Sequence, residues 1–255
     1  MYRLGGWVRE RMNVTVWNEF YEERKFPSVS AVYPDGLHVV LRQALVEHLG
    51  PEADVRVALQ EEPEHGLGQT VLDETDVLLW WSHLKDDEVS DEVVERVRRR
   101  VLDGMGLLIL HSAIGSKIAK ALLGTSGQMT GWRHGDSELL WTILPGHEIV
   151  RGVPNPVVIP SGEMYGEPLD IPTPDELVFI SSYQGGEVLR SGCGFFRGRG
   201  RIFFFAPGHE EAPIYFQPEI RRILANAVRW AAPPAEAQPK ASRQGEYPKN
   251  WWVEA

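Results

Sequence analysis

One short segment, residues 106–110, constrains the fold of this chain more than any other. In it a glycine is followed by four large aliphatic residues, and the run then ends in His111 and Ser112. A short, unbroken apolar run predicts a strand that is buried on both faces, at the centre of a parallel sheet. A helix-compatible segment over 116–123 follows, so the turn between them must be sharp. Because ligands of open parallel sheets bind outside the carboxyl ends of the strands, we expect the functional site around His111.

The same alternation of strand and helix recurs along the chain. Further strands are predicted at 13–17, 55–59, 77–81, 177–180, 188–196 and 202–205, and helices at 37–49, between Ser90 and Gly104, and from Ile220 onwards. This order predicts the α/β class with a mostly parallel central sheet. The stretch 127–174 is rich in Gly, Pro and Trp and is expected against one edge of the sheet, whereas 18–36 is predicted to be a long loop over something functional.

The length of the chain and its cysteine count set its organisation. We expect one domain over 12–232, preceded by an N-terminal extension at 1–11 and followed by a Pro-rich tail at 233–255. The tail is predicted to be extended, although its Trp251–Trp252 pair could dock on the body or on another subunit, as in a homo-oligomer. The single cysteine, Cys193, excludes an internal disulfide and fits a reducing compartment.

Charge and hydropathy exclude several classes of partner. The net charge of −10 argues against nucleic acid, which needs clustered Lys and Arg. No apolar run reaches the roughly 18 residues of a membrane span, and no signal peptide is evident, so a cytoplasmic protein is expected. The glycine-rich runs at 66–68 and 198–200 lack phosphate-loop spacing, so no nucleotide cofactor is expected.

Three histidines, His83, His111 and His209, each follow a predicted strand at its carboxyl end. If these strands are neighbours, the three imidazoles point into one crevice. Three neutral imidazoles and a carboxylate would suit a divalent metal, zinc above all, with one position open for water or substrate. The carboxylate would come from 163–167 or 210–211. Alternatively, these are unrelated histidines that satisfy backbone groups at strand ends.

A nucleophile offers a competing interpretation. Ser112 lies where a strand-to-helix turn would present a catalytic side chain, and His209 with Glu211 could serve as base and orienting acid. However, Leu110 stands where such a turn normally has a glycine. His134 is a further candidate for the same crevice.

Aromatic residues beside the polar strand ends suggest a sugar ligand. Trp17, Trp81 and Tyr165 could pack flat rings on the C–H faces of a sugar, while Arg133 and Glu167 bind its hydroxyl groups. Core packing alone would explain at least half of the aromatic residues.

Seven segments together resemble the trehalose utilisation protein family, ThuA, over about residues 12–232. They are 14–19, 78–83, 110–112, 163–167, 175–181, 185–193 and 207–210. The family is similar in fold to the class I glutamine amidotransferases, so the resemblance implies a flavodoxin-like three-layer sandwich. In that superfamily the turn carries a cysteine, where this chain has His111 and Ser112. Without a thiol, glutamine hydrolysis is not expected.

The resemblance implies a role in trehalose or disaccharide catabolism, on a sugar or on a 3-keto sugar that a partner sugar dehydrogenase supplies. We expect His111, His209, Glu163 and Ser112 to be the catalytic candidates, with His83, His111 and His209 as the candidate metal ligands. One alternative is a non-catalytic, amidotransferase-like module that binds sugar or assembles with a partner. A second is a hydrolase that depends on Ser112.

Overall fold

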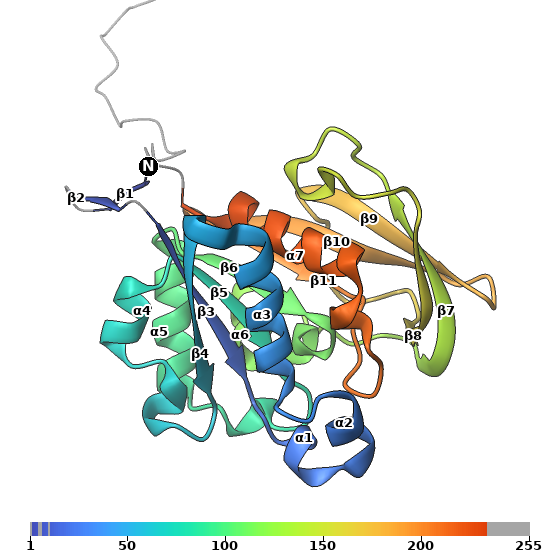
Figure 1. Ribbon diagram of the computed structural model, residues 1–255, viewed down its shortest axis with the longest axis horizontal. Coiled ribbons are helices and arrows are strands. Elements are labelled where there is room, and N and C mark those ends of the chain that lie inside the picture. Colours follow the sequence, from blue (N-terminus) through green and yellow to red (C-terminus); the bar gives the residue numbers. More distant parts are fainter. Residues whose placement is uncertain (1, 5–6, 10, 234–255) are drawn as a thin grey trace, which may run out of the picture.

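The computed structural model describes residues 2–4, 7–9 and 11–233. Their main feature is a nine-stranded sheet in the order β4-β3-β5-β6-β11-β10-β9-β7-β8 (Figure 1). The expected tail at 233–255 lies outside the described residues from position 234 onwards. Ahead of the sheet, β1 (Tyr2–Leu4) and β2 (Trp7–Arg9) pair with each other in an antiparallel manner.

Half of the sheet is parallel and holds the strands that the apolar runs predict. It consists of β3 (Met12–Asn18), β4 (Ala53–Leu59), β5 (Val77–Trp81), β6 (Gly106–Leu110) and β11 (Gly200–Phe205). Every residue of β5 and β6 is buried, which is why both are apolar throughout. The expected central position of 106–110 is confirmed, since β6 lies between β5 and β11.

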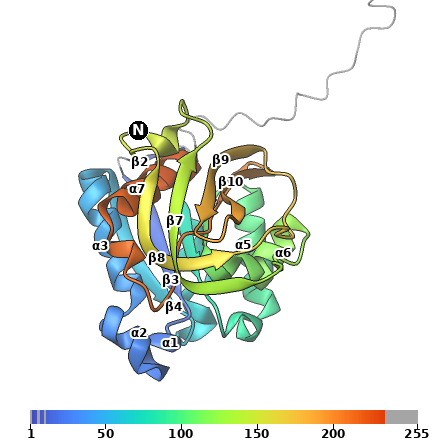
Figure 2. The same cartoon turned by 90° about the vertical axis from the view of Figure 1, so that its right-hand side faces the viewer.

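The other half is antiparallel, so the expectation of a mostly parallel sheet is wrong. Its strands are β7 (Trp132–Thr142), β8 (Val157–Tyr165), β9 (Glu176–Tyr183) and β10 (Val188–Arg197). Four neighbouring pairs are parallel and four are antiparallel. The physical reason is the connections: parallel neighbours need a long crossover, usually a helix, and from β7 onwards the chain has no α-helix until α7. The stretch 127–174 therefore extends the sheet and forms its edge at β8 (Figure 2).

Helices cover both faces of the parallel half (Figure 1). One face carries α3 (Leu37–Leu49) and α7 (Pro218–Ala231), and the other carries α4 (Gln69–Glu74), α5 (Asp91–Leu102) and α6 (Lys117–Leu123). Each face has its own cluster of buried apolar side chains. Ser90 caps α5 as predicted, because its Oγ accepts a hydrogen bond from the N–H of Val93.

The segment 18–36 is not one long loop. It contains two short helices, α1 (Glu22–Lys25) and α2 (Pro27–Val32), which begin just beyond the carboxyl end of β3. Among the described residues, no helix is long and apolar enough to cross a membrane.

Candidate functional site

A cavity of about 490 Å³ lies where the carboxyl ends of the parallel strands meet β7 and β8. The residues after β5, β6 and β11 form one side, and β7 and β8 supply the other. Its walls include His83, Ser112, Lys120, Trp132, His134, Glu163, Tyr165, His209 and Glu210. The expected position of the site, beyond the carboxyl ends of the strands, therefore coincides with a real cavity.

His111 lies directly after β6, at the sharp turn that the sequence predicts. Its φ of 51° is a conformation that few residues with side chains adopt, and such strain is characteristic of functional turns. Its Nδ1 lies 2.8 Å from the carbonyl oxygen of Ala206. A carbonyl only accepts, so Nδ1 carries a proton, and Nε2 is left to act as the acid–base or ligand atom.

A glycine makes the packing around His111 possible. A Cβ on Gly208 would lie 2.7 Å from the Cβ of His111 and 2.6 Å from the hydroxyl of Tyr215, closer than real atoms approach. The segment after β11 can therefore lie directly against the histidine only because residue 208 has no side chain.

Glu163 and Tyr165 come from β8 and face the His111 ring. The Nε2 of His111 lies 2.9 Å from the Glu163 Oε2 and 2.9 Å from the Tyr165 hydroxyl. When Nε2 is protonated it donates to the carboxylate, and when it is not it accepts from the phenol. The second Glu163 oxygen lies 3.1 Å from the Nε2 of His134, its partner in the β7–β8 register. Burial acts to raise the pKa of Glu163, but the hydrogen bond and charge of His111, with His209 and His134, lower it overall.

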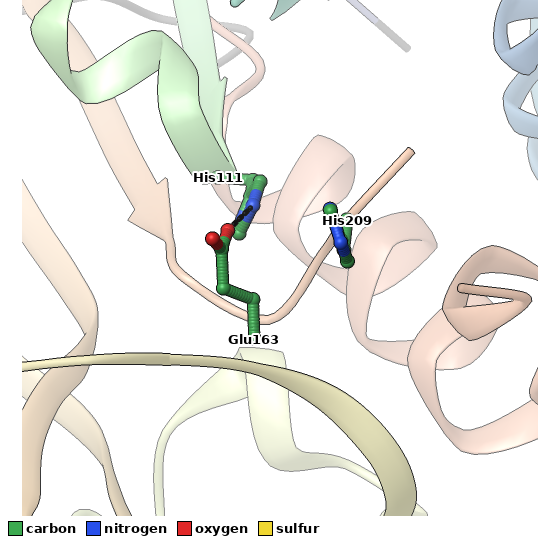
Figure 3. A group of neighbouring side chains, drawn as sticks. All are labelled: His111, Glu163 and His209. Carbon is green, nitrogen blue, oxygen red and sulfur yellow. Dashed lines mark hydrogen bonds and ion pairs between the residues drawn. The ribbon is translucent and has the colours of Figure 1, made fainter. Parts of the chain in front are cut away.

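His209 faces the same carboxylate from the segment after β11 (Figure 3). Its ring centroid lies 4.7 Å from that of His134 and 6.1 Å from that of His111. Its Nδ1 donates to Glu210 at 3.0 Å, so the acid that orients it is Glu210 and not the expected Glu211, which is exposed. Burial acts to lower the pKa of His209, but the hydrogen bond and charge of Glu210, with Glu163, raise it overall.

His83 belongs to a neighbouring group. Its Nδ1 lies 3.0 Å from Glu22 Oε2 and 3.7 Å from Glu210 Oε1, and Glu19 accepts from its backbone N–H at 2.8 Å. Burial acts to lower the pKa of His83, but Glu22, Glu210 and Glu19 raise it to about 9. The expected ligand set of His83, His111 and His209 is therefore not formed, because these carboxylates hold His83 apart.

Three sets of side chains among the described residues place their ligand atoms within 4.8 Å of one another. They are His111, Glu163 and His209; His134, His209 and Glu211; and Glu22, His83 and Glu210. The first set fits a divalent metal best, because the Nδ1 atoms of His111 and His209 each donate to an oxygen, so that Nε2 of each ring, once deprotonated, is the atom that would coordinate.

Ser112 lines the cavity, but its hydroxyl donates to the backbone carbonyl of Ser82 at 2.8 Å. Its proton therefore does not point at a histidine, as an activated nucleophile requires.

The expected sugar contacts divide into three groups. Tyr165 lies in the cavity wall. Trp17 and Trp81 are fully buried in the two apolar clusters and have no surface to offer a ligand, so both expectations are wrong. Arg133 and Glu167 line a second cavity, which also includes Trp132.

Trp132, whose side chain is 66% exposed and lines the cavity, belongs to the aromatic residues beside the predicted strand ends that suggested a sugar ligand. Sequence analysis did not identify two acidic residues in or beside the cavity. Glu22 does not line the cavity but contacts His83, which does, and it lies in the segment predicted to be a long loop over something functional. Asp86 follows β5 after a short interval; burial raises its pKa to about 7 although Ser82 and Lys120 oppose this shift.

Comparisons with known proteins bear on the family. The family ThuA, described as trehalose utilisation, matches residues 13–231. Two solved structures of putative ThuA-like proteins have the same fold. The one from Parabacteroides merdae has a TM-score of 0.67 at 16% identity, covering 91% of this chain and 92% of that one. The one from Bacteroides uniformis has a TM-score of 0.60 at 14% identity, covering 94% and 97%.

A cytoplasmic protein from Salmonella typhimurium is also similar in fold, with a TM-score of 0.58 at 10% identity and coverage of 87% and 100%. No curated protein matches the sequence significantly. At these identities the solved structures show the fold alone, whereas the family match spans most of the chain and confirms the resemblance that the seven segments suggested. The chain belongs to the ThuA, or trehalose utilisation, family.

Proposed function

We propose that this protein is an enzyme of sugar metabolism that moves a proton on a carbon next to a sugar carbonyl. The observation that carries the proposal is the position of Glu163, whose carboxylate lies between His111 and His134 inside the cavity and opposite His209. The match to a family described as trehalose utilisation supports a sugar as the substrate.

Glu163 and His209 form an acid–base pair. The lowered pKa of Glu163 keeps it ionised at neutral pH, as a base must be, and the raised pKa of His209 favours the protonated form. Such opposite shifts in one cavity distinguish a base from an acid. Glu163 takes a proton from the carbon, while His209 donates a hydrogen bond or a proton to the carbonyl oxygen, where negative charge develops.

The remaining groups would position the sugar. Tyr165 stays protonated, because burial raises its pKa well above the usual range, so its hydroxyl can donate to the substrate or to His111. The exposed indole of Trp132 supplies a flat apolar surface, which the C–H face of a sugar ring can cover.

A divalent metal, with zinc as the first candidate, is a second route to the same chemistry. His111, Glu163 and His209 would hold it, and when bound it would polarise the carbonyl as a Lewis acid. In that case His134 is the nearest unligated imidazole to Glu163 and remains able to exchange a proton with it.

Deuterium exchange into a 3-keto sugar tests the proposal directly. In D₂O the enzyme should exchange the hydrogen next to the carbonyl, and NMR would follow its loss. Glu163→Gln should reduce the rate by about 10²–10⁴-fold, the usual contribution of a general base. No exchange by the wild-type protein would overturn the proposal and leave a non-catalytic sugar-binding module as the alternative.

Glu176→Gln is the matched control. Glu176 accepts a hydrogen bond from His147 at 3.1 Å, much like the contact between Glu163 and His111, but neither residue lines the cavity. The control should therefore retain exchange.

Other features of the proposed function await direct tests. Metal analysis of the purified protein and of His111→Ala would decide whether zinc is bound. We propose that a sugar dehydrogenase supplies the keto sugar, that the protein acts in the cytoplasm, and that it forms a homo-oligomer.

The parallel strands follow the order second, first, third, fourth, fifth along the sheet, which supports a flavodoxin-like, amidotransferase-like origin.

A further inference from the structure

A second cavity, of about 530 Å³, adjoins the one that holds the histidines. Its lining comes from the start of β7, the end of β8 and the turn before β10, so it belongs to the antiparallel half of the sheet. The side chain of Trp132 lines both cavities. One ligand that occupies both cavities would therefore contact the Trp132 indole in each of them.

The polar surface of the second cavity is fixed in place. Arg133 donates to Glu187 through Nη1 at 2.9 Å and through Nη2 at 3.1 Å, and it donates to Asp136 through Nε at 3.0 Å and through Nη2. These bonds use four of the five guanidinium N–H groups, so among the described residues one N–H remains for a ligand. The Glu187 carboxylate is partly exposed and can accept a further bond.

A paired guanidinium and carboxylate present a donor and an acceptor side by side. Neighbouring hydroxyl groups of a sugar need this combination, because each hydroxyl both donates and accepts. With the flat Trp132 ring beside it, the cavity has the two kinds of surface that a sugar ring requires.

Two glycines, Gly131 and Gly166, form part of the lining of the cavity. Gly166 donates its N–H to the Gly131 carbonyl at 2.9 Å. A Cβ on Gly166 would lie 2.5 Å from the Thr130 hydroxyl oxygen, so a side chain there would displace the Thr130 side chain. Beside them, Glu167 is held by Arg190 at 2.8 Å, which fixes the end of β8.

We propose that the second cavity is a second sugar subsite, which holds the other ring of a disaccharide whose reacting ring lies between Glu163 and His209. The inference rests on the proposed function and deepens it, because it makes the substrate a keto disaccharide and not a single keto sugar. Trp132 then contacts both rings.

Filling the cavity tests this proposal. Val188 lines it and is 54% exposed, so Val188→Trp should block the space without disturbing the core. The matched control is Val158→Trp, since Val158 is 55% exposed on β8 and lines neither cavity. The readout is kcat/KM for deuterium exchange into 3-ketotrehalose divided by kcat/KM for exchange into 3-ketoglucose.

The wild-type protein should favour the disaccharide, and Val188→Trp should lower the ratio by roughly tenfold, the expected effect of losing one stacked ring and its hydrogen bonds. Glu187→Gln should lower it in the same direction, whereas Val158→Trp should not change it. A wild-type ratio near one, or a ratio that Val188→Trp and Glu187→Gln leave unchanged, overturns the subsite alone. If neither sugar undergoes exchange, the proposed function is overturned as well.

Discussion

Four strands of the parallel half, β3, β5, β6 and β11, are buried along most of their length, whereas β8 and the second half of β7 include both buried and exposed positions. The two halves also bring different groups to the cavity. The parallel half supplies His83, His111 and His209 at the ends of its strands, and the antiparallel half supplies His134, Glu163, Tyr165 and Trp132 from within strands. The difference shows that the histidines of the parallel half do not form the site alone. The carboxylate that lies between their side chains, Glu163, comes from the antiparallel half.

The largest expected effect concerns that carboxylate. Glu163→Gln removes the charge of the carboxylate and should reduce exchange most. His134→Ala should leave His111 paired with Glu163 and remove only the second imidazole, so we expect exchange to fall by roughly tenfold, much less than in Glu163→Gln. Steady-state rates of both variants would measure this. Equal losses would show that the base depends as much on His134 as on the Glu163 carboxylate itself.

The two halves should also differ in how strongly they stabilise the fold. Leu108 is fully buried in β6, so Leu108→Ala should lower the free energy of unfolding by about 2–5 kcal/mol. Val158 in β8 is 55% exposed, so Val158→Ala should change it by less than about 0.5 kcal/mol. Urea denaturation measures both values, and similar losses would contradict the contrast between the halves.

A smaller effect is expected where the parallel half packs around its own histidine. Gly208→Ala would force apart His111 and Tyr215, at a cost of about 1–3 kcal/mol, and it should also reduce exchange because His111 moves. Gly146→Ala is the control, because a Cβ there meets open space. A stable and fully active Gly208→Ala protein would show that the close packing is unimportant.

The smallest effect is a dependence of stability on pH. The pKa of His83 rises from 6.5 to about 9 on folding. The stabilisation is complete below pH 6.5 and is lost as the pH rises to 9, because the folded protein then holds a proton that the unfolded chain has released. His83 is partly exposed, so the change should be small.

Urea denaturation between these pH values would show the effect as a smaller decline in His83→Gln than in the wild type. Some decline should remain, because the pKa of His209 is also raised. An identical decline in both proteins would mean that the carboxylates around His83 do not stabilise its charged form.

Much of the fold could be predicted, because the responsible signals are local. The apolar runs at β5 and β6 identified buried strands, and Ser90 marked the start of α5. The direction of β7 to β10 could not be predicted, since alternation along a strand does not say which neighbour it joins. The mixed sheet is a consequence of connections that contain no α-helix.

The site divides in the same way. His111 and His209 could be found because each follows a strand, and Glu163 was one of several candidate carboxylates for the same crevice. The burial of Trp17 and Trp81 could not be foreseen, because a tryptophan at a strand end has the same sequence signal whether it faces the core or the cavity.

The sequence by itself determined which strands are buried, where the chain turns sharply and which imidazoles lie at one end of the sheet, because each of these depends on a few consecutive residues. Only the tertiary structure decided that Glu163 joins His111 to His134, that Glu22 and Glu210 hold His83 apart, and that Trp132 stands between two cavities. These relations depend on the register of β7 with β8 and on the packing of segments far apart in the chain, and hydrophobic periodicity encodes neither of them.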